Sequence, residues 1–203
     1  SPAAAAHVWK DAPDDAGRAL DGLLNLSLLK VVPGGTERYR LHDLLDEYAA
    51  GKLPAAEADS ANRTHAEYLI ALFTEHAMDD LSTAPEVALE LDNLRATVTW
   101  VISKQEGNVM ALLATRPRNW FYNVFRINEE WLSWLTASLK LGIEDRGLQA
   151  NVRKAIGDVQ SFRDERDAAL KSYEAALELF RAVGDRLGEA NVLQALGDVQ
   201  SFR

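Results

Sequence analysis

The 203-residue sequence contains no cysteine. This absence excludes disulfide bonds and thiolate metal sites, and it suits a reducing compartment. No run of about twenty apolar residues occurs either, so we expect no segment to span a membrane. The sequence has no initiator methionine, and residues 1–6 have neither the basic start nor the long apolar middle of a secretory signal. We therefore expect a cytoplasmic piece of a longer protein, cut at both ends.

Basic residues are in the minority, with 22 Lys and Arg against 31 Asp and Glu, and the formal net charge is -9. A surface of this sign repels phosphate backbones, so we expect no nucleic acid among the partners. The apolar fraction of 47% and the charged fraction of 26% are ordinary for a globular chain. The length allows one or two buried cores.

Catalytic motifs are also missing. The sequence contains neither a Gly-x4-Gly-Lys-Ser/Thr phosphate loop nor a Gly-x-Ser-x-Gly nucleophile elbow. His65 and His76 would lie about three helical turns apart, roughly 16 Å, so they cannot share one metal. Adjacent acidic pairs point about 100° apart on a helix, which is typical of solvated faces rather than acid and base couples. We therefore expect no catalytic residue, metal or cofactor in this segment.

The most informative pattern is an identical heptapeptide. Residues 157–163 read Gly-Asp-Val-Gln-Ser-Phe-Arg, and residues 197–203 repeat these letters forty positions later. Two amphipathic patterns fill the gap, separated by polar or glycine breaks at 162–165 and 183–185. The first pattern places Ala169, Leu170, Tyr173, Ala176, Leu177 and Phe180 on one helix face; the second, from about 187 to 202, does so with Ala190, Leu193, Leu196, Gly197 and Phe202. This spacing predicts stacked helical hairpins.

This pattern resembles the tetratricopeptide repeat in a longer form of about forty residues. The resemblance implies an α-solenoid in which small residues allow close helix packing at Gly157, Ala169 and Ala176, with Gly197 in the second copy. It also implies that the aromatic ring of Tyr173 fills the space between the two helices of its pair. The sequence departs from the family at Arg153, where a Trp is usual, and at Gln160, where a Tyr is usual. The alternative is an ordinary helical bundle that contains a chance repeat.

In such an array, the first helix of each hairpin lines an inner groove. The groove positions suggested by the resemblance are Asn151, Lys154, Asn191 and Gln194. The family uses this groove for protein or peptide ligands, so a ligand of that kind is the expected partner.

The first 54 residues have a different pattern. A proline and two acidic residues start a helix that ends near Asn25, with Ala16, Ala19, Leu20, Leu23, Leu24 and Leu26 on one face. Residues 28–32, 33–36 and 38–41 are typical of a strand, a turn and a strand. A further helix begins at His42 or Asp43. Helix, two-stranded wing and helix form the closing half of a winged-helix domain, but the first helix has three aspartates against Arg18, so DNA binding is not expected.

Residues 38–45 (Arg-Tyr-Arg-Leu-His-Asp-Leu-Leu) resemble the Met-His-Asp element of the STAND (NB-ARC type) signalling ATPases, with Leu41 in place of Met. Residues 89–96 (Leu-Glu-Leu-Asp-Asn-Leu-Arg-Ala) resemble the stretch that follows the winged helix in bacterial members. The resemblance implies that the winged helix packs on an intramolecular nucleotide-binding domain. It also implies that His42, with Asp43, senses the β-phosphate of ADP in the parent, which would bind ADP or ATP with Mg. Alternatively, His42 and Asp43 simply cap a helix.

Residues 55–143 are predicted to be a helical linker or capping region. Helices are expected over 55–80 and 86–104, and over 109–125 around Pro117, which either kinks this helix or starts its second half. A concentration of aromatic residues follows from Trp120 to Trp134, and such a stripe is more often core than ligand pocket. Residues 109–142 are expected to form an irregular first repeat that caps the array.

The sequence thus predicts a mainly α protein with a partial winged helix at 1–54, a linker at 55–143 and tetratricopeptide-like repeats at 144–203. The expected function is the regulatory or sensor portion of a STAND-type ATPase, which in the intact parent would oligomerise on activation. The alternative is a constitutive scaffold whose repeats join protein partners without a nucleotide switch. The trigger, the output and the number of repeats are left open.

Overall fold

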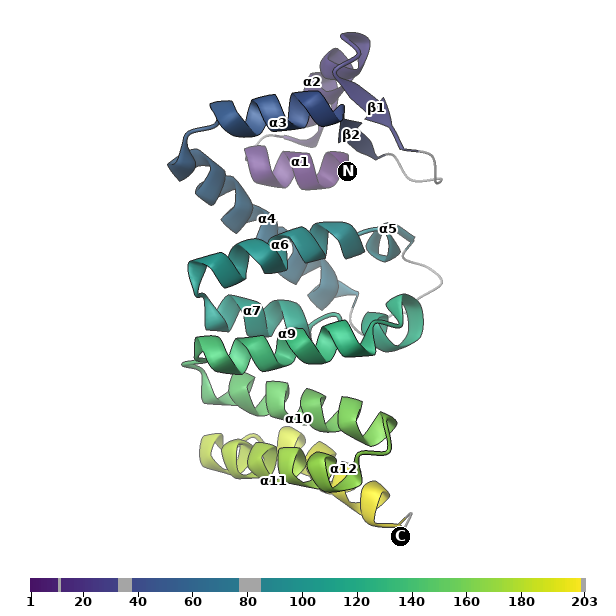
Figure 1. The fold of residues 1–203 in the computed structure, drawn as a ribbon, viewed down its shortest axis with the longest axis vertical. Helices are drawn as coiled ribbons and strands as arrows, with labels where there is room; N and C mark the ends of the chain where they lie inside the picture. The colour runs from purple at the N-terminus through teal and green to yellow at the C-terminus, as the bar shows by residue number, and fades with distance from the viewer. Residues whose placement is uncertain (11, 33–37, 77–84, 202–203) are drawn as a thin grey trace. The chain divides into compact units, whose positions relative to one another are not determined.

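The computed structural model describes residues 1–10, 12–32, 38–76 and 85–201, and Figure 1 shows its elements. Over these residues the protein is mainly helical with one two-stranded antiparallel sheet, as the sequence predicts. The chain divides into two compact units, Ser1–Leu72 and Phe73–Arg203. This division falls within the long helix α4 (Ala55–Glu75), whereas the sequence suggested boundaries after residues 54 and 143.

Proline and a hydroxyl cap start the first two helices of unit 1. The Ser1 hydroxyl accepts a hydrogen bond from the backbone N–H of Ala4, and Pro2 and Pro13 occupy first-turn positions whose N–H would have no helical partner. The elements of this unit are α1 (Pro2–Trp9), α2 (Pro13–Asn25), β1 (Leu29–Val31), β2 (Tyr39–Leu41), α3 (Asp43–Lys52) and most of α4.

Helix α2 buries a narrower face than its periodicity predicts. Ala16 and Leu20 are buried, and with Leu29 of β1 they belong to the core of this unit. Leu23 and Leu24 are half-buried, but Ala19 and Leu26 are exposed. The prediction was wrong for these last two residues because α1 and β1 cover only one side of α2.

Strands β1 and β2 form the hairpin predicted for this region. They pair antiparallel, with Leu29 opposite Leu41 and Val31 opposite Tyr39. The turn expected at residues 33–36 lies outside the described residues. Ser27, with a φ of 57°, turns the chain out of α2 towards β1. The order of helix, hairpin and helix therefore agrees with the predicted one.

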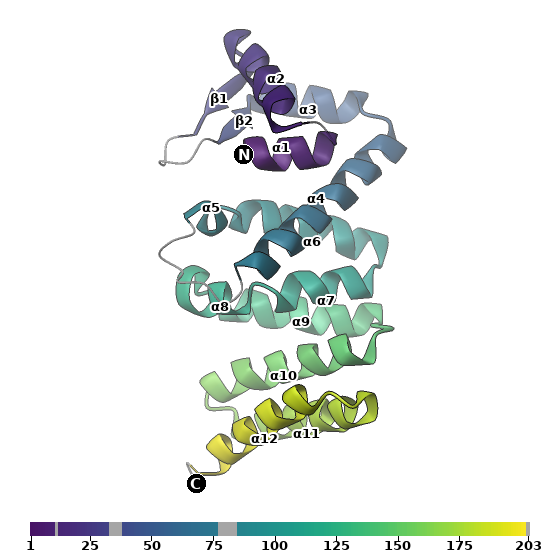
Figure 2. The same cartoon turned by 180° about the vertical axis from the view of Figure 1, so that it is seen from behind.

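Unit 2 is built from helices that mainly contact their neighbours in the chain. Helix α7 packs against α9, and both contact α10; α10 then packs against α11, and α11 against α12 (Figures 1 and 2). Helices α9 and α10, on either side of the predicted boundary at residue 143, pack together. The elements are α5 (Pro85–Ala88), α6 (Leu91–Lys104), α7 (Gly107–Thr115), α8 (Arg118–Trp120), the π-helical turn η1 (Phe121–Phe125), α9 (Asn128–Leu141), α10 (Arg146–Phe162), α11 (Arg166–Val183) and α12 (Arg186–Ser201).

The helix expected over residues 86–104 is interrupted at Glu90. This residue is only 1% exposed, and its carboxylate accepts a hydrogen bond from the Asn93 amide. Its backbone N–H donates to Val87 O and its carbonyl accepts from Leu94 N–H, so Glu90 ends α5 and starts α6. Glu90 is the N-cap residue of α6, but its carboxylate makes no capping hydrogen bond to the backbone; periodicity alone could not reveal this break.

Pro117 starts a new helix rather than kinking one. Helix α7 ends at Thr115, and Pro117 is the N-cap residue of α8. At its other end, α7 approaches the end of α9 closely: a Cβ on Gly107 would lie 1.7 Å from the carbonyl oxygen of Gly142. Gly142 has a φ of 88°, which favours glycine. Two glycines therefore allow the ends of α7 and α9 to meet.

The aromatic residues form a core, which confirms the prediction for this stretch. Trp120, Phe121 and Trp131 have no exposed surface, and Trp134 is nearly buried. The ring centroid of Phe121 lies 5.3 Å from that of Trp131 and 5.6 Å from that of Trp134. The Trp131 indole N–H donates to Ala114 O at 2.7 Å, so its polar group is satisfied within the core.

Helices α10 and α11 approach closely at Gly157. A Cβ at this position would lie 2.6 Å from the ring of Tyr173, which is itself 3% exposed. Ala169 and Ala176, one turn before and after Tyr173 on α11, are fully buried in the same core. The buried face of α11 agrees with the predicted one, including Leu177 and Phe180.

Helix α12 buries a different face from the one that its sequence suggests. Gly188, Val192 and Val199 are buried, and a Cβ on Gly188 would lie 2.4 Å from the ring of Phe180. Ala190 and Leu193 are exposed, as is Gly197, where an added Cβ would meet nothing within 4 Å. The prediction was wrong for Ala190, Leu193 and Gly197 because α11 covers one side of the helix and no described element covers the other. It was right for Leu196, which is half-buried against the α11 core, and Phe202 lies outside the described residues.

Because Gly157 is closely packed and Gly197 is open, we expect substitution by alanine to have opposite effects at these two positions. Gly157→Ala is expected to lower the free energy of unfolding by about 1 to 2 kcal/mol, because overpacking against Tyr173 outweighs the higher helix propensity of alanine. Gly197→Ala, on an open face, is expected to leave stability unchanged or raise it by up to about 1 kcal/mol. Urea unfolding followed by circular dichroism measures both. Equal effects of the two substitutions would contradict the close packing at Gly157.

Candidate functional site

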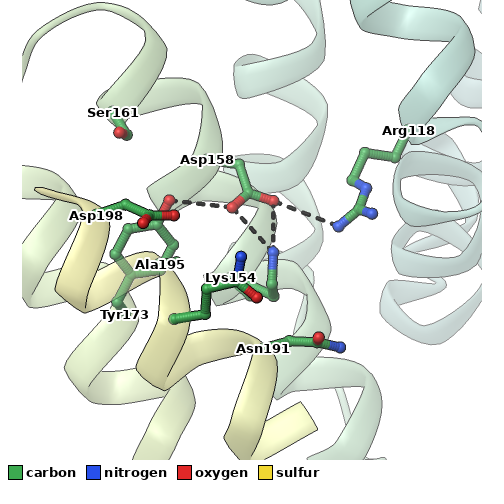
Figure 3. A pocket seen from close by; sticks show the side chains of 9 residues that line it. Arg118, Lys154, Asp158, Ser161, Tyr173, Asn191, Ala195 and Asp198 are labelled. Atoms are coloured by element: carbon green, nitrogen blue, oxygen red, sulfur yellow. Dashed lines mark hydrogen bonds and ion pairs between the residues drawn. The ribbon is translucent and has the colours of Figure 1, made fainter. Parts of the chain in front are cut away.

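The four groove residues suggested by the sequence lie on α10 and α12 and line two adjoining cavities. Lys154, Asn191 and Gln194 line a cavity of about 350 Å³, shown in Figure 3. Asn151, Lys154 and Asn191 line a second cavity of about 440 Å³. Arg118 of α8, Lys154 and Asn191 border both cavities. We call the two cavities together the groove.

Both helices begin with the same local structure. The Asp145 side chain accepts a hydrogen bond from Leu148 N–H at 2.7 Å, and the Asp185 side chain accepts one from Gly188 N–H at 2.9 Å. Each aspartate satisfies a backbone N–H of the first turn and fixes where its helix starts. The asparagine six residues after each aspartate, Asn151 or Asn191, therefore occupies the same position in its helix.

Asp158 is the centre of the polar network in the smaller cavity (Figure 3). Its carboxylate accepts hydrogen bonds from the Lys154 ammonium at 2.9 and 3.0 Å and from the Tyr173 hydroxyl at 3.0 Å. Arg118 reaches the same carboxylate at 3.5 Å. The network joins α8, α10 and α11, and the Lys154 and Asp158 side chains are only 15% and 17% exposed. Asp158 thus pairs with both cations at this end of the groove, and its single negative charge balances only one of them.

Two tyrosines in this region are held in the protonated state. Burial raises the pKa of Tyr173 above its ordinary value, and the neighbouring Asp158 carboxylate adds to this shift. Burial also raises the pKa of Tyr122, again with a contribution from the charge of Asp158. Ionisation would remove the proton that Tyr173 donates and place a second negative charge beside the carboxylate. The Tyr173 hydroxyl is therefore a hydrogen-bond donor at neutral pH.

The α12 side of the groove carries side chains that are not engaged. Among the described residues, those of Asn191, Gln194 and Asp198 make no hydrogen bond or ion pair, although all three line the smaller cavity. Two amides and a carboxylate provide both donors and acceptors. This side of the groove can therefore form hydrogen bonds with a polar ligand without breaking existing ones.

The larger cavity has a cationic lining. Arg116, Arg118 and Lys154 border it, and none of the described residues that line it is acidic. Apolar surface from Ala155, Phe180 and Leu187 completes the wall. On a chain with a net charge of -9, this is a local positive region. A negatively charged group on a ligand would find its complement here.

The proposed nucleotide-sensing pair lies in unit 1, at the start of α3. His42 is the N-cap residue, and its exposed side chain makes no capping hydrogen bond, so capping through its imidazole is not observed. The side chain of Asp43 lies outside what the structure describes. Within the described residues there is no group of His, Cys, Asp or Glu side chains arranged to hold a metal ion. None of the helices described is long and apolar enough to cross a membrane.

Sequence analysis missed several polar residues of the groove, among them Arg118, Asp158 and Asp198. Asp158 and Asp198 occupy the second position of the repeated heptapeptide, so an acidic residue recurring at the same helix position was a usable signal. Arg118 reaches the groove from α8, forty residues before Asp158. No periodicity in the sequence connects these two residues.

No protein-family model matches the chain, and neither a curated protein nor a solved structure matches it.

The network predicts an alkaline change in stability. Because the pKa of Tyr173 is raised in the folded state, the stability it contributes is complete below pH 10 and is lost as pH rises from about 10 through the folded pKa. Tyr173→Phe is expected to lower the free energy of unfolding at pH 7 by about 1 to 2 kcal/mol, through loss of a hydrogen bond to a charged group. It should also flatten the decline in stability above pH 10.

Urea unfolding between pH 7 and 11.5 measures both effects. Tyr48→Phe is the matched control, because Tyr48 is 64% exposed and lies in the other unit. An alkaline decline of the same slope in native protein and Tyr173→Phe would contradict the role of the Tyr173 hydroxyl.

Proposed function

We propose that this chain is the regulatory or sensor portion of a STAND-type signal-transduction ATPase, and that its tetratricopeptide-like helices bind a protein or peptide trigger. One observation carries the binding proposal: Asn151, Lys154, Asn191 and Gln194, chosen from the repeat pattern, line two adjoining cavities. Chance placement around a helix would have turned some of them away from a common groove.

The chemistry of the groove favours a peptide ligand. An amide side chain can donate and accept at once, so Asn191 and Gln194 match the alternating N–H and C=O groups of an extended peptide. The two cavities, of about 350 and 440 Å³, are of the size that holds a few residues. The lining is polar on α12 and partly apolar near Phe180, which suits a segment that presents both main chain and side chains.

Charge narrows the class of ligand further. Lys154 and Arg118 already face Asp158, whereas Arg116 has no ion pair among the described residues. A carboxylate on the ligand would therefore be placed at the larger cavity, near Arg116 and Arg118. The proposed trigger is an extended peptide segment. Its main-chain N–H and C=O groups are free to bind Asn191 and Gln194, and it carries an acidic group at one end.

The N-terminal unit supports the switch part of the proposal. Leu44 and Tyr48 are 73% and 64% exposed, and they lie one turn apart on α3. This apolar strip is suited to pack on an intramolecular nucleotide-binding domain. His42 at the N-terminus of α3 is exposed, and a helix N-terminus with an imidazole is favourable for a phosphate. In the parent, ADP or ATP with Mg would bind to the nucleotide-binding domain, with the β-phosphate of ADP contacting His42. Activation would lead to oligomers in the cytoplasm.

The binding proposal can be tested with a displayed library of random peptides selected on the chain. The expected result is a set of peptides, enriched in an acidic residue, that bind native protein. Asn191→Ala should weaken the binding of these peptides about fivefold, through the loss of about one hydrogen bond. The double substitution Asn151→Ala and Asn191→Ala should weaken it more strongly. Binding should also weaken with added salt.

Asn25→Ala provides the matched control, because Asn25 is an exposed asparagine in unit 1. Fluorescence anisotropy of one selected peptide measures all variants. Selected peptides that bind the doubly substituted chain as tightly as native protein would place the ligand site elsewhere.

The nucleotide switch is tested by reading the coding sequence upstream of Ser1. A Gly-x4-Gly-Lys-Ser/Thr loop after a predicted strand is expected within a few hundred residues. In the full-length protein, His42→Ala should then weaken ADP binding and raise activity without the trigger. If no such loop is encoded, the switch fails and the chain is a constitutive repeat scaffold.

A further inference from the structure

The cations of the larger cavity outnumber the carboxylates that pair with them. Arg116, Arg118 and Lys154 border this cavity. Asp158 pairs with Lys154 and Arg118, but it carries a single negative charge. Three cations and one carboxylate leave a local excess of two positive charges. A carboxylate on a ligand would balance half of this excess, whereas a group with two negative charges would balance all of it.

Two of the three cations can turn towards a ligand at little cost. The Arg116 side chain is exposed and makes no hydrogen bond or ion pair among the described residues. Arg118 reaches Asp158 only at 3.5 Å, and its side chain is 44% exposed. Lys154 is held more tightly, at 2.9 and 3.0 Å from the two oxygens of Asp158. The arginines are therefore the mobile partners, and Lys154 supplies a fixed positive charge.

The three cations lie close enough to act on one compact anion. Arg118 and Lys154 both contact the same oxygen of Asp158, Oδ2, and Figure 3 shows both side chains directed at this carboxylate. Arg116 precedes Arg118 by two residues, at the point where α7 ends and α8 begins. Side chains from this junction and from α10 thus border one space of about 440 Å³, which is large enough for a phosphorylated side chain.

A phosphate monoester has the charge and the shape that this space requires. At neutral pH it carries a charge of about -1.5 to -2 and offers three strong acceptor oxygens. The planar guanidinium of arginine binds phosphate through two parallel hydrogen bonds, and a carboxylate has only two oxygens for three cations. The larger cavity is therefore better matched to a phosphate than to a carboxylate.

The acidic residues of this region restrict where such a group can bind. Asp158 and Asp198 border the smaller cavity, so a doubly charged anion is disfavoured there. Asp185 lies near Gly188 of the larger cavity, but its carboxylate accepts a hydrogen bond from the Gly188 N–H. The positive end of α12 offsets the charge of Asp185. A phosphate would therefore bind in the larger cavity, beside Arg116.

The position of Asn191 limits the length of the phosphorylated side chain. This residue borders both cavities, and its amide can bond the main chain of a peptide. Main chain at Asn191 and phosphate at the neighbouring arginines must therefore lie close together on the ligand. Phosphoserine and phosphothreonine are short enough for this arrangement, whereas the ring of a phosphotyrosine would separate the two groups.

We infer that the groove recognises a peptide phosphorylated on serine or threonine, with the phosphate in the larger cavity against Arg116, Arg118 and Lys154. The adjoining main chain lies along Asn191 and Gln194. This inference rests on the proposed peptide binding and names the group that the trigger must carry, but it does not depend on the nucleotide switch. Phosphorylation of the partner protein then controls whether it is recognised.

The test selects a synthetic library of short peptides, each with one fixed phosphoserine, on the full 203-residue chain. One selected sequence is then made with phosphoserine, glutamate or serine at the fixed position. Fluorescence anisotropy at constant ionic strength measures the three affinities. Relative to the phosphoserine form, the glutamate form should bind about fivefold more weakly and the serine form at least about tenfold more weakly.

Arg116→Gln should lower the preference for phosphoserine over serine at least about fivefold, because it removes one charge-assisted contact. Arg146→Gln is the matched control. Arg146 is an exposed arginine at the start of α10 that lines neither cavity, so its substitution makes the same change in net charge. It should leave the preference unchanged. Circular dichroism checks that both variants keep their helix content.

The possible failures are distinguishable. Equal affinities of the three forms, or a preference that Arg116→Gln leaves intact, overturn the phosphate inference and leave peptide binding standing. If neither this library nor its unphosphorylated counterpart binds at about 1 mM, both proposals fail. Inorganic phosphate should displace little of the selected peptide at about 10 mM. If it competes as strongly as the unlabelled phosphopeptide, the cavity takes free phosphate and the peptide inference is wrong.

Discussion

The contact between Gly157 and the ring of Tyr173 positions the charged network of the groove. Only a residue without a Cβ lets the ring lie this close to the backbone of α10. The hydroxyl of that ring then reaches Asp158, and the same carboxylate holds Lys154 and Arg118. Helix spacing, ring position and charge placement are therefore one set of linked constraints. Moving α11 outwards would disturb each of them.

This arrangement divides the groove by chemistry. On α10 the charged groups are satisfied by one another, so they fix geometry more than they attract a ligand. On α12 the amides of Asn191 and Gln194 have no partner in the part of the chain that is described. Specificity for a ligand would therefore come mainly from hydrogen bonds to α12 and from the cations that border the larger cavity.

Sequence patterns predicted the helices better than the faces that they bury. Periodicity identified α11 and its buried residues, because neighbouring helices cover the face that its apolar residues define. The same reasoning failed for α12, since burial there depends on which side has a neighbour. It also missed the break between α5 and α6 at Glu90. This residue is buried, and its carboxylate accepts a hydrogen bond from the Asn93 amide.

Candidate site residues could be found from the sequence only where the repeat carried them. Asn151 and Asn191 occupy matching positions in two copies, and both border the groove. Arg118 belongs to a short helix between the two halves of an irregular hairpin, and no repeat or period marks it. Its position depends on how α8 follows Pro117, which is a matter of tertiary packing.

The uneven packing of α12 has a consequence for the order of local opening. Helix α10 is held between α9 and α11, whereas α12 rests mainly on α11. In an array of helices that contact their neighbours, fluctuations begin at the least supported element. Amide hydrogens of α12 should therefore exchange with solvent sooner than those of α10. Part of the groove belongs to that helix. Ligand occupancy and backbone protection of α12 are therefore thermodynamically linked, and a bound ligand slows exchange there first.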